Sequence, residues 1–232
     1  MNTYISRIIT EARKGIDTFS STEYRLGVLK QVISVCEEAL RAEAIKTCTP
    51  SVKSRHQVLT KAIKNAIERE PYRKDMHGIG VFENAQSFTN GYWSCWLVGD
   101  DRIPELPVIV GEPYNVSNYI KNFTGQSIDL TVLDVEKIKQ VIHDRDIKKK
   151  MAPKNEKSNQ ENSLALFDLG QDLPRFNADY LLAAIMVLPG PIESVEISKS
   201  NPSKGPIIIR SKESFSLICP FSKPKKEEEA KS

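Results

Sequence analysis

Long hydrophobic runs and closely spaced cysteines are both missing from this chain of 232 residues. The longest apolar stretch, Tyr180 to Leu188, has nine residues, whereas a membrane-spanning helix needs about 20. The opening residues are too polar for a secretory signal peptide. No two of the four cysteines lie closer than twelve residues, which excludes CxxC metal and redox motifs. We therefore expect a cytoplasmic protein with reduced thiols, no membrane association and no metal site.

Catalytic signatures are also absent. The sequence contains no GxGxxG, Walker, HExxH or GxSxG motif. Its three histidines are widely spaced, and the adjacent pair Asp100 and Asp101 is more typical of a turn than of a two-metal site. The sequence thus indicates a protein that is not an enzyme and has no cofactor. An enzyme on an α+β scaffold is therefore the least favoured hypothesis for this chain.

Positive charge is concentrated in two segments, although the net charge of the chain is only +3. Residues 51–74 carry seven Lys and Arg against two Glu, and residues 137–157 carry eight against three acidic residues. Clusters of this kind are typical of phosphate binding. Two solvated helix faces would give the same pattern, so the charge distribution alone leaves both interpretations open.

Hydrophobic spacing predicts several helices. Apolar residues recur at helical intervals in residues 1–50, from about 55 to 70, and from about 135 to 145, where Asp134 is a good N-cap. Asn177 is expected to cap an apolar helix that ends at Leu188, before Pro189 and Gly190.

Strands are predicted by β-branched and aromatic residues and by turn signals. Residues 78–98 indicate two or three antiparallel strands, and three more are expected at 194–198, 206–210 and 215–219. Phe88, Tyr92 and Trp96 share one parity and Trp93 the other, which favours a strand with one core face over a base-stacking platform. The order of elements predicts an α+β fold with an antiparallel sheet.

The segment FNADYLLAAIMVL, residues 176–188, resembles the last helix of bacterial DNA polymerase sliding clamps, the β subunit family. The family has Phe-Asn, two variable residues, Tyr-Leu-Leu and then an apolar helix. The likeness continues through the three following strands, up to the closing sequence Ser216-Leu-Ile-Cys-Pro-Phe. A weaker likeness covers residues 55–145 and includes Phe88-Thr-Asn-Gly-Tyr. The chain thus resembles a short clamp-like protein of phage or mobile-element type.

This resemblance implies clamp-like βαβββ units with antiparallel sheets, preceded by an α-helical N-terminal segment. The implied organisation has four parts. They are a helical segment 1–50, a first unit 51–128, a second unit 129–222 that contains a mobile loop at 148–163, and a disordered tail 223–232.

The resemblance also implies a function. In a sliding clamp, helices line a central hole, and their basic side chains meet DNA phosphates without reading bases. The positions that would do so here are Lys61, Lys64, Lys137 and Lys139. The implied protein is a processivity factor that binds double-stranded DNA and tethers a DNA polymerase or another replication or repair protein. Because the chain is too short for a three-domain clamp, closing a ring would require a homo-oligomer.

The alternative is an interaction module that keeps the clamp fold but forms no ring. In the family, a hydrophobic cleft beside the closing strand receives short peptides, and the matching positions are Leu217, Cys219, Pro220 and Phe221. The apolar helix 178–188, which has no basic residue, favours this alternative. Plain core packing would explain the same residues. We also expect one shared core made of Leu181, Leu182, Ile185, Ile207, Ile209 and Leu217.

Overall fold

The computed structural model describes residues 7, 8, 10, 14, 27, 28, 30–36, 39, 50–151, 164–170, 173–202 and 204–221. Within the predicted N-terminal helical segment, residues 30–36 are helical. The rest of that prediction lies mostly outside the described residues, as do the predicted tail 223–232 and the part of the predicted loop at 152–163. None of the helices in the described ranges combines the length and the apolar character needed to cross a bilayer.

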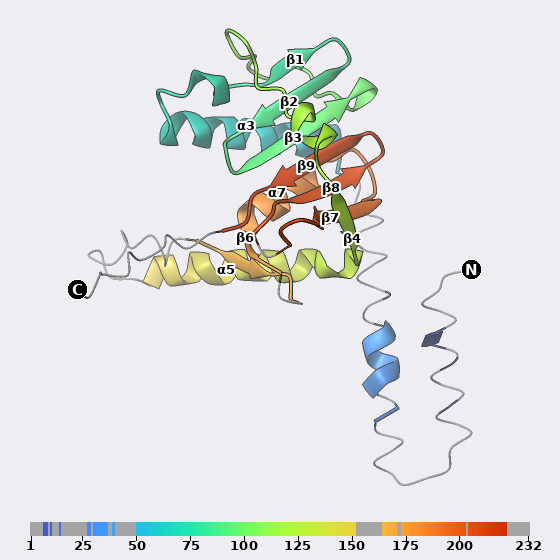
Figure 1. Cartoon of the computed structure of the whole chain (residues 1–232). Coiled ribbons are helices and arrows are strands. Elements are labelled where there is room, and N and C mark those ends of the chain that lie inside the picture. Colours follow the sequence, from blue (N-terminus) through green and yellow to red (C-terminus); the bar gives the residue numbers. More distant parts are fainter. Residues whose placement is uncertain are drawn as a thin grey trace, which may run out of the picture.

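A seven-stranded antiparallel sheet organises the described part of the chain, with strand order β1-β2-β3-β9-β8-β7-β4 (Figure 1). Its strands are β1 Gly80–Phe82, β2 Ala85–Thr89, β3 Trp93–Val98, β4 Gly125–Ile128, β7 Ser194–Ser198, β8 Ile207–Ser211 and β9 Ser214–Ile218. β5 Leu166–Asp168 and β6 Arg175–Asn177 form a separate two-stranded sheet. The predicted α+β class with antiparallel strands is confirmed, and the last two predicted strands are shifted by one residue.

The order of one helix and three antiparallel strands occurs twice. α3 Val52–Arg69 precedes β1, β2 and β3, and α7 Ala178–Val187 precedes β7, β8 and β9. The two sets of strands join where β3 and β9 pair antiparallel, with Cys95 opposite Ser216. Their helices also pack against each other. Both sets share one hydrophobic core.

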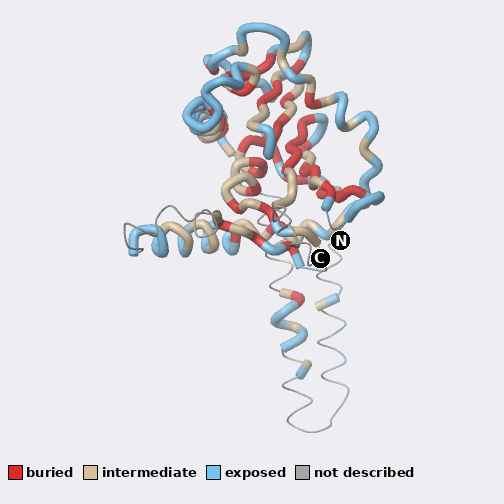
Figure 2. The backbone as a smooth tube through the Cα atoms, turned by 60° about the vertical axis from the view of Figure 1, so that its left-hand side comes forward, coloured by how far each residue is buried: buried red, intermediate tan, exposed pale blue. Residues whose placement is uncertain are grey.

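Helix α7 lies at the centre of the helical layer, and α3 and α5 Val135–Met151 lie on either side of it (Figure 1). Asn177 caps α7 as predicted, because its Oδ1 accepts the backbone N–H of Asp179 at 2.9 Å. Figure 2 shows the buried stretches of backbone concentrated in the body of the molecule, while α5 projects from it and is largely exposed toward its end.

The expected shared core is partly wrong. Leu181, Ile185, Ile207 and Ile209 are buried together between the helices and the sheet. Leu182, one residue along the helix from Leu181, is only half-buried. Leu217 packs on the opposite face of the sheet, in a second cluster with Val116, Ile208 and Phe215. The reason is strand alternation: the neighbouring Ser216 faces α7, where its hydroxyl donates to the carbonyl of Ala184 at 3.1 Å.

The aromatic residues of the β2–β3 hairpin do not follow the predicted parity. Phe88 and Trp93 are each only 1% exposed and pack together in the main core, with ring centroids 5.3 Å apart. The turn between the strands interrupts the alternation of side chains between the two faces of the sheet. In this turn, Asn90 Oδ1 accepts hydrogen bonds from the backbone N–H groups of Tyr92 and Trp93. Gly91 supports this turn with a φ of 84°. Tyr92 is therefore half-exposed, whereas the predicted core strand itself is confirmed.

Helix α5 is longer than predicted. The N-cap prediction is confirmed, since Asp134 Oδ1 accepts the backbone N–H of Lys137 at 3.1 Å. The helix continues to Met151, so residues 148–151 are helical and the predicted loop is wrong for them. Three consecutive lysines in this last turn gave no apolar pattern to detect, although basic residues are favourable at a helix C-terminus.

Candidate functional site

A groove runs between the three helices, with α3 and α5 as walls and α7 as floor. It encloses a cavity of ≈ 660 Å³, which lies within the ordinary range of ligand sites. The apolar side chains that line it come from all three helices, from β3 and from the chain before β1 and before β5. They are Val58, Ala62, Ala66, Met76, Trp93, Ile142, Leu164, Leu182, Ala183 and Met186.

Charged side chains surround this apolar lining. Lys61 and Arg69 come from α3, and Arg145 and Lys149 come from α5. Both Nη atoms of Arg145 donate hydrogen bonds to the carboxylate of Asp179 at the start of α7. Its Nε donates to Asp146 at 2.9 Å. Burial opposes the charge of Arg145, but the hydrogen bonds to Asp179 and Asp146 outweigh burial and raise the pKa of the guanidinium. Arg145 therefore fastens α5 to α7.

Arg69 is held at one end of the groove by two tyrosines. Its Nη1 donates to Tyr180 Oη at 2.6 Å, and its guanidinium lies 4.8 Å from the centre of the Tyr92 ring. The two tyrosine rings stack with centroids 6.3 Å apart. Burial raises the pKa of Tyr180, although Arg69 opposes the shift, so this phenol stays protonated at neutral pH. Sequence reasoning missed this cluster because its members come from α3, the β2–β3 turn and α7.

The structure only partly groups the four lysines predicted to bind DNA. Lys61 and Lys64 lie three residues apart, so they project from one side of α3. Lys137 and Lys139 lie two residues apart, about 200° around the helix, and project from opposite flanks of α5.

Three of these lysines have carboxylate partners on their own helix or at its N-cap. The Nζ of Lys64 lies 3.9 Å from Glu68, that of Lys137 lies 3.7 Å from Asp134, and that of Lys139 lies 2.8 Å from Glu136. All three lysine side chains are more than half exposed. Exposed pairs of this kind contribute only about 0–1 kcal/mol. They leave the lysines able to exchange a carboxylate for a phosphate.

Arg55 belongs to the basic segment 51–74 but is not available to a ligand, because it is only 4% exposed. Its Nε donates to the carbonyl of Val187 at 2.8 Å, and its Nη2 donates to the carbonyl of Asp101. Burial lowers the pKa of this guanidinium, with Asp101 opposing the shift. Arg55 thus satisfies the C-terminal end of α7.

Asp100 and Asp101 form the short 3-10 turn η2 Gly99–Asp101, in agreement with the predicted turn. The carboxylate of Asp101 accepts the Ser214 hydroxyl at 2.9 Å, which ties the turn to β9. Across the residues that the structure describes, no three His, Cys, Asp or Glu side chains gather as a metal site would require.

The residues predicted to form a peptide pocket lie around the end of β9. Leu217 is only 7% exposed, and the half-buried Cys219 packs against the same outer cluster, where burial raises the pKa of its thiol. Pro220 is half-buried. The backbone N–H of Phe221 donates to the carbonyl of Arg175 at 2.8 Å, which places this residue beside β6. The structure thus groups Leu217 with Cys219 but gives Leu217 little surface to offer a peptide.

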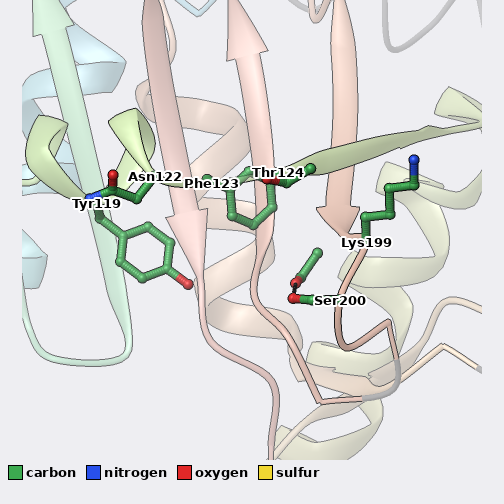
Figure 3. A pocket seen from close by; sticks show the side chains of 7 residues that line it. Tyr119, Asn122, Phe123, Thr124, Lys199 and Ser200 are labelled. Atoms are coloured by element: carbon green, nitrogen blue, oxygen red, sulfur yellow. Dashed lines mark hydrogen bonds between the residues drawn. The ribbon is translucent and has the colours of Figure 1, made fainter.

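A second cavity, of ≈ 460 Å³, lies between α4 Ser117–Lys121, the start of β4 and the end of β7 (Figure 3). Tyr119 and Phe123 line one part of it, with ring centroids 6.1 Å apart, and Lys199 and Ser200 line another. None of the four predicted pocket residues lines this cavity.

No family model matches the chain, and neither the curated proteins nor the solved structures include a significant match. Its function is therefore inferred from the charges, burial and contacts described above.

Proposed function

We propose that this protein binds duplex DNA through the phosphates, without reading base sequence, on the face formed by α3 and α5. The uneven distribution of charge carries this proposal. Apart from the buried Arg55, α3 has four basic residues and one acidic residue, and α5 has six basic and three acidic. The strands of the described sheets together carry two basic and two acidic residues. Phosphates attract such a positive helical face, and phosphate contacts carry no direct sequence information.

The fold supports a clamp-like role for this binding. A helix followed by three antiparallel strands occurs twice, with the helices on one side of a shared sheet. In a sliding clamp, the helices likewise face DNA and the strands form the outer surface. The proposed role is a processivity factor that holds a DNA polymerase or another replication or repair protein on the duplex. Because the described residues of one chain form a single such sheet, encircling DNA would need several copies.

Sequence independence is the property that tests this function. Two duplexes of equal length and unrelated sequence, titrated at the same low salt concentration and followed by fluorescence anisotropy, should bind with affinities within about two-fold of each other. Absence of binding to both duplexes, or a preference above about ten-fold for one of them, would contradict the proposal, since specific readout requires contacts to base edges.

A further inference from the structure

The shape of the groove between α3 and α5 suits a helix. Its walls are themselves helices, and its floor is α7, whose Ala183 and Met186 contribute to the lining. Ala62 of α3 contributes only a methyl group to the lining, which leaves room for a side chain of a docked helix. An amphipathic helix that docks in a groove inserts apolar residues at positions i, i+3 or i+4, and i+7. The apolar lining described above can accept such a stripe.

The charge of the groove selects an acidic occupant. Four cations line it against two carboxylates, Glu70 and Asp179. Asp179 is already bound by Arg145. Arg69 is held by Tyr180 and Tyr92. Lys61 on one wall and Lys149 on the other therefore remain to meet acidic side chains on both flanks of a docked helix.

Trp93 belongs both to the lining of the groove and to the hydrophobic core. This residue lines the groove and is only 1% exposed. Its indole Nε1 has no hydrogen-bond acceptor among the described residues. Buried indole N–H groups usually have a partner. The Trp93 Nε1 atom is itself buried, so a ligand docked in the groove would contact the ring of Trp93 rather than this nitrogen.

We propose that this groove binds an acidic amphipathic helix of a partner protein. The proposal goes beyond DNA binding and does not rest on it, because Lys61 is the only one of the four predicted DNA-binding lysines that lines the groove. Charge on both walls together with the apolar lining between them favours an amphipathic peptide helix over the phosphate backbone of a duplex.

Trp93 can also report the binding. The chain has two tryptophans, and Trp96 packs outside the groove against Phe82, with ring centroids 4.9 Å apart. In a Trp96→Phe background, Trp93 is the single emitter. The probe is a peptide of about 16 residues with Leu at helical spacing and Glu on both flanks. A second peptide carries Lys in place of Glu. Saturable shifts of the Trp93 emission are expected with the Glu peptide only.

Matched charge reversals locate the site. Lys149→Glu should weaken the Glu peptide by about ten-fold or more. Lys150→Glu changes the charge equally at the next residue of α5, which does not line the groove, and should keep the affinity within about two-fold. Circular dichroism and thermal melting of each variant confirm that the fold is retained, as expected for exposed lysines.

Three outcomes would overturn this inference. The first is an unchanged Trp93 emission with the Glu peptide at millimolar concentration. The second is equal binding of the Lys peptide, or equal loss of affinity in Lys149→Glu and Lys150→Glu. The third is a short DNA duplex that shifts Trp93 emission with the same dependence on Lys149, which would make phosphate rather than a peptide the occupant. Failure of the duplex titration described above would leave the peptide result unaffected.

Discussion

Replacing Lys61, Lys64, Lys137 and Lys139 together with alanine is expected to weaken duplex DNA binding roughly 100-fold at moderate salt. Each exposed lysine that meets a phosphate contributes up to about 1 kcal/mol, and about 1.4 kcal/mol corresponds to a factor of ten in affinity. The intrahelical partners of Lys64, Lys137 and Lys139 do not prevent this, because these pairs are weak and exposed. Fluorescence anisotropy with a labelled duplex measures the loss.

The matched control removes the same charge elsewhere. Lys121, Lys199, Lys204 and Lys212 are all exposed and lie outside α3 and α5. Their combined replacement with alanine should reduce affinity far less. An equal loss in both quadruple variants would mean that net charge alone, and not the helical face, determines binding. Because Lys137 and Lys139 project from opposite flanks of α5, the pair Lys61 and Lys64 should account for more of the loss than the α5 pair.

Arg55→Met is expected to lower the free energy of unfolding by about 2–5 kcal/mol. The substitution keeps a long apolar stem but leaves the carbonyls of Val187 and Asp101 without the donors that now satisfy them. Each buried polar group left unpaired costs about 1–3 kcal/mol. Urea unfolding followed by circular dichroism measures the change.

Lys53→Met provides the comparison for Arg55, since Lys53 lies two residues earlier on α3 and is exposed. It should change stability by no more than about 0.5 kcal/mol. Well below its melting temperature, the Arg55→Met variant should bind DNA as tightly as the original protein, because Arg55 is buried. A stability loss below about 1 kcal/mol, or a selective loss of DNA binding in the folded variant, would show that this structural role is wrong.

Local signals in the sequence were sufficient for most helices and strands. The cap at Asn177 and the apolar residues after it predicted α7, and Asp134 predicted the start of α5. The last turn of α5 escaped prediction because three lysines and a methionine carry no apolar period. The pairing of β3 with β9 joins residues more than 100 positions apart, so no local pattern could reveal it.

Strand β9 shows how alternation can mislead. Its more apolar side, with Phe215 and Leu217, faces away from α7 and lies in the cluster around Val116. Its helix-facing side carries serines whose hydroxyls are satisfied, Ser214 by Asp101 and Ser216 by Ala184. The apolar residues of β9 therefore predicted their own burial correctly. They did not indicate which side of the strand packs against α7.

The candidate sites depend still more on tertiary structure. Two basic segments could be seen in the sequence, yet burial removes Arg55 from the possible DNA contacts and helical spacing separates Lys137 from Lys139. The groove could not be predicted, because its lining joins α3, α5 and α7 with Trp93 from the sheet. These elements are far apart in the sequence, so no local spacing of residues indicates that they meet in the fold.

The salt dependence of duplex binding tests the central claim most directly. A plot of the logarithm of the association constant against the logarithm of the salt concentration should be linear, with a slope of about −4 or steeper for the original protein, since each phosphate contact contributes about −0.9. The variant without Lys61, Lys64, Lys137 and Lys139 should have a slope flatter by about two to three, because Lys137 and Lys139 project from opposite flanks of α5 and do not both face one duplex. Unchanged slopes in the two proteins, or a slope near zero in the original, would contradict phosphate binding by the helices α3 and α5.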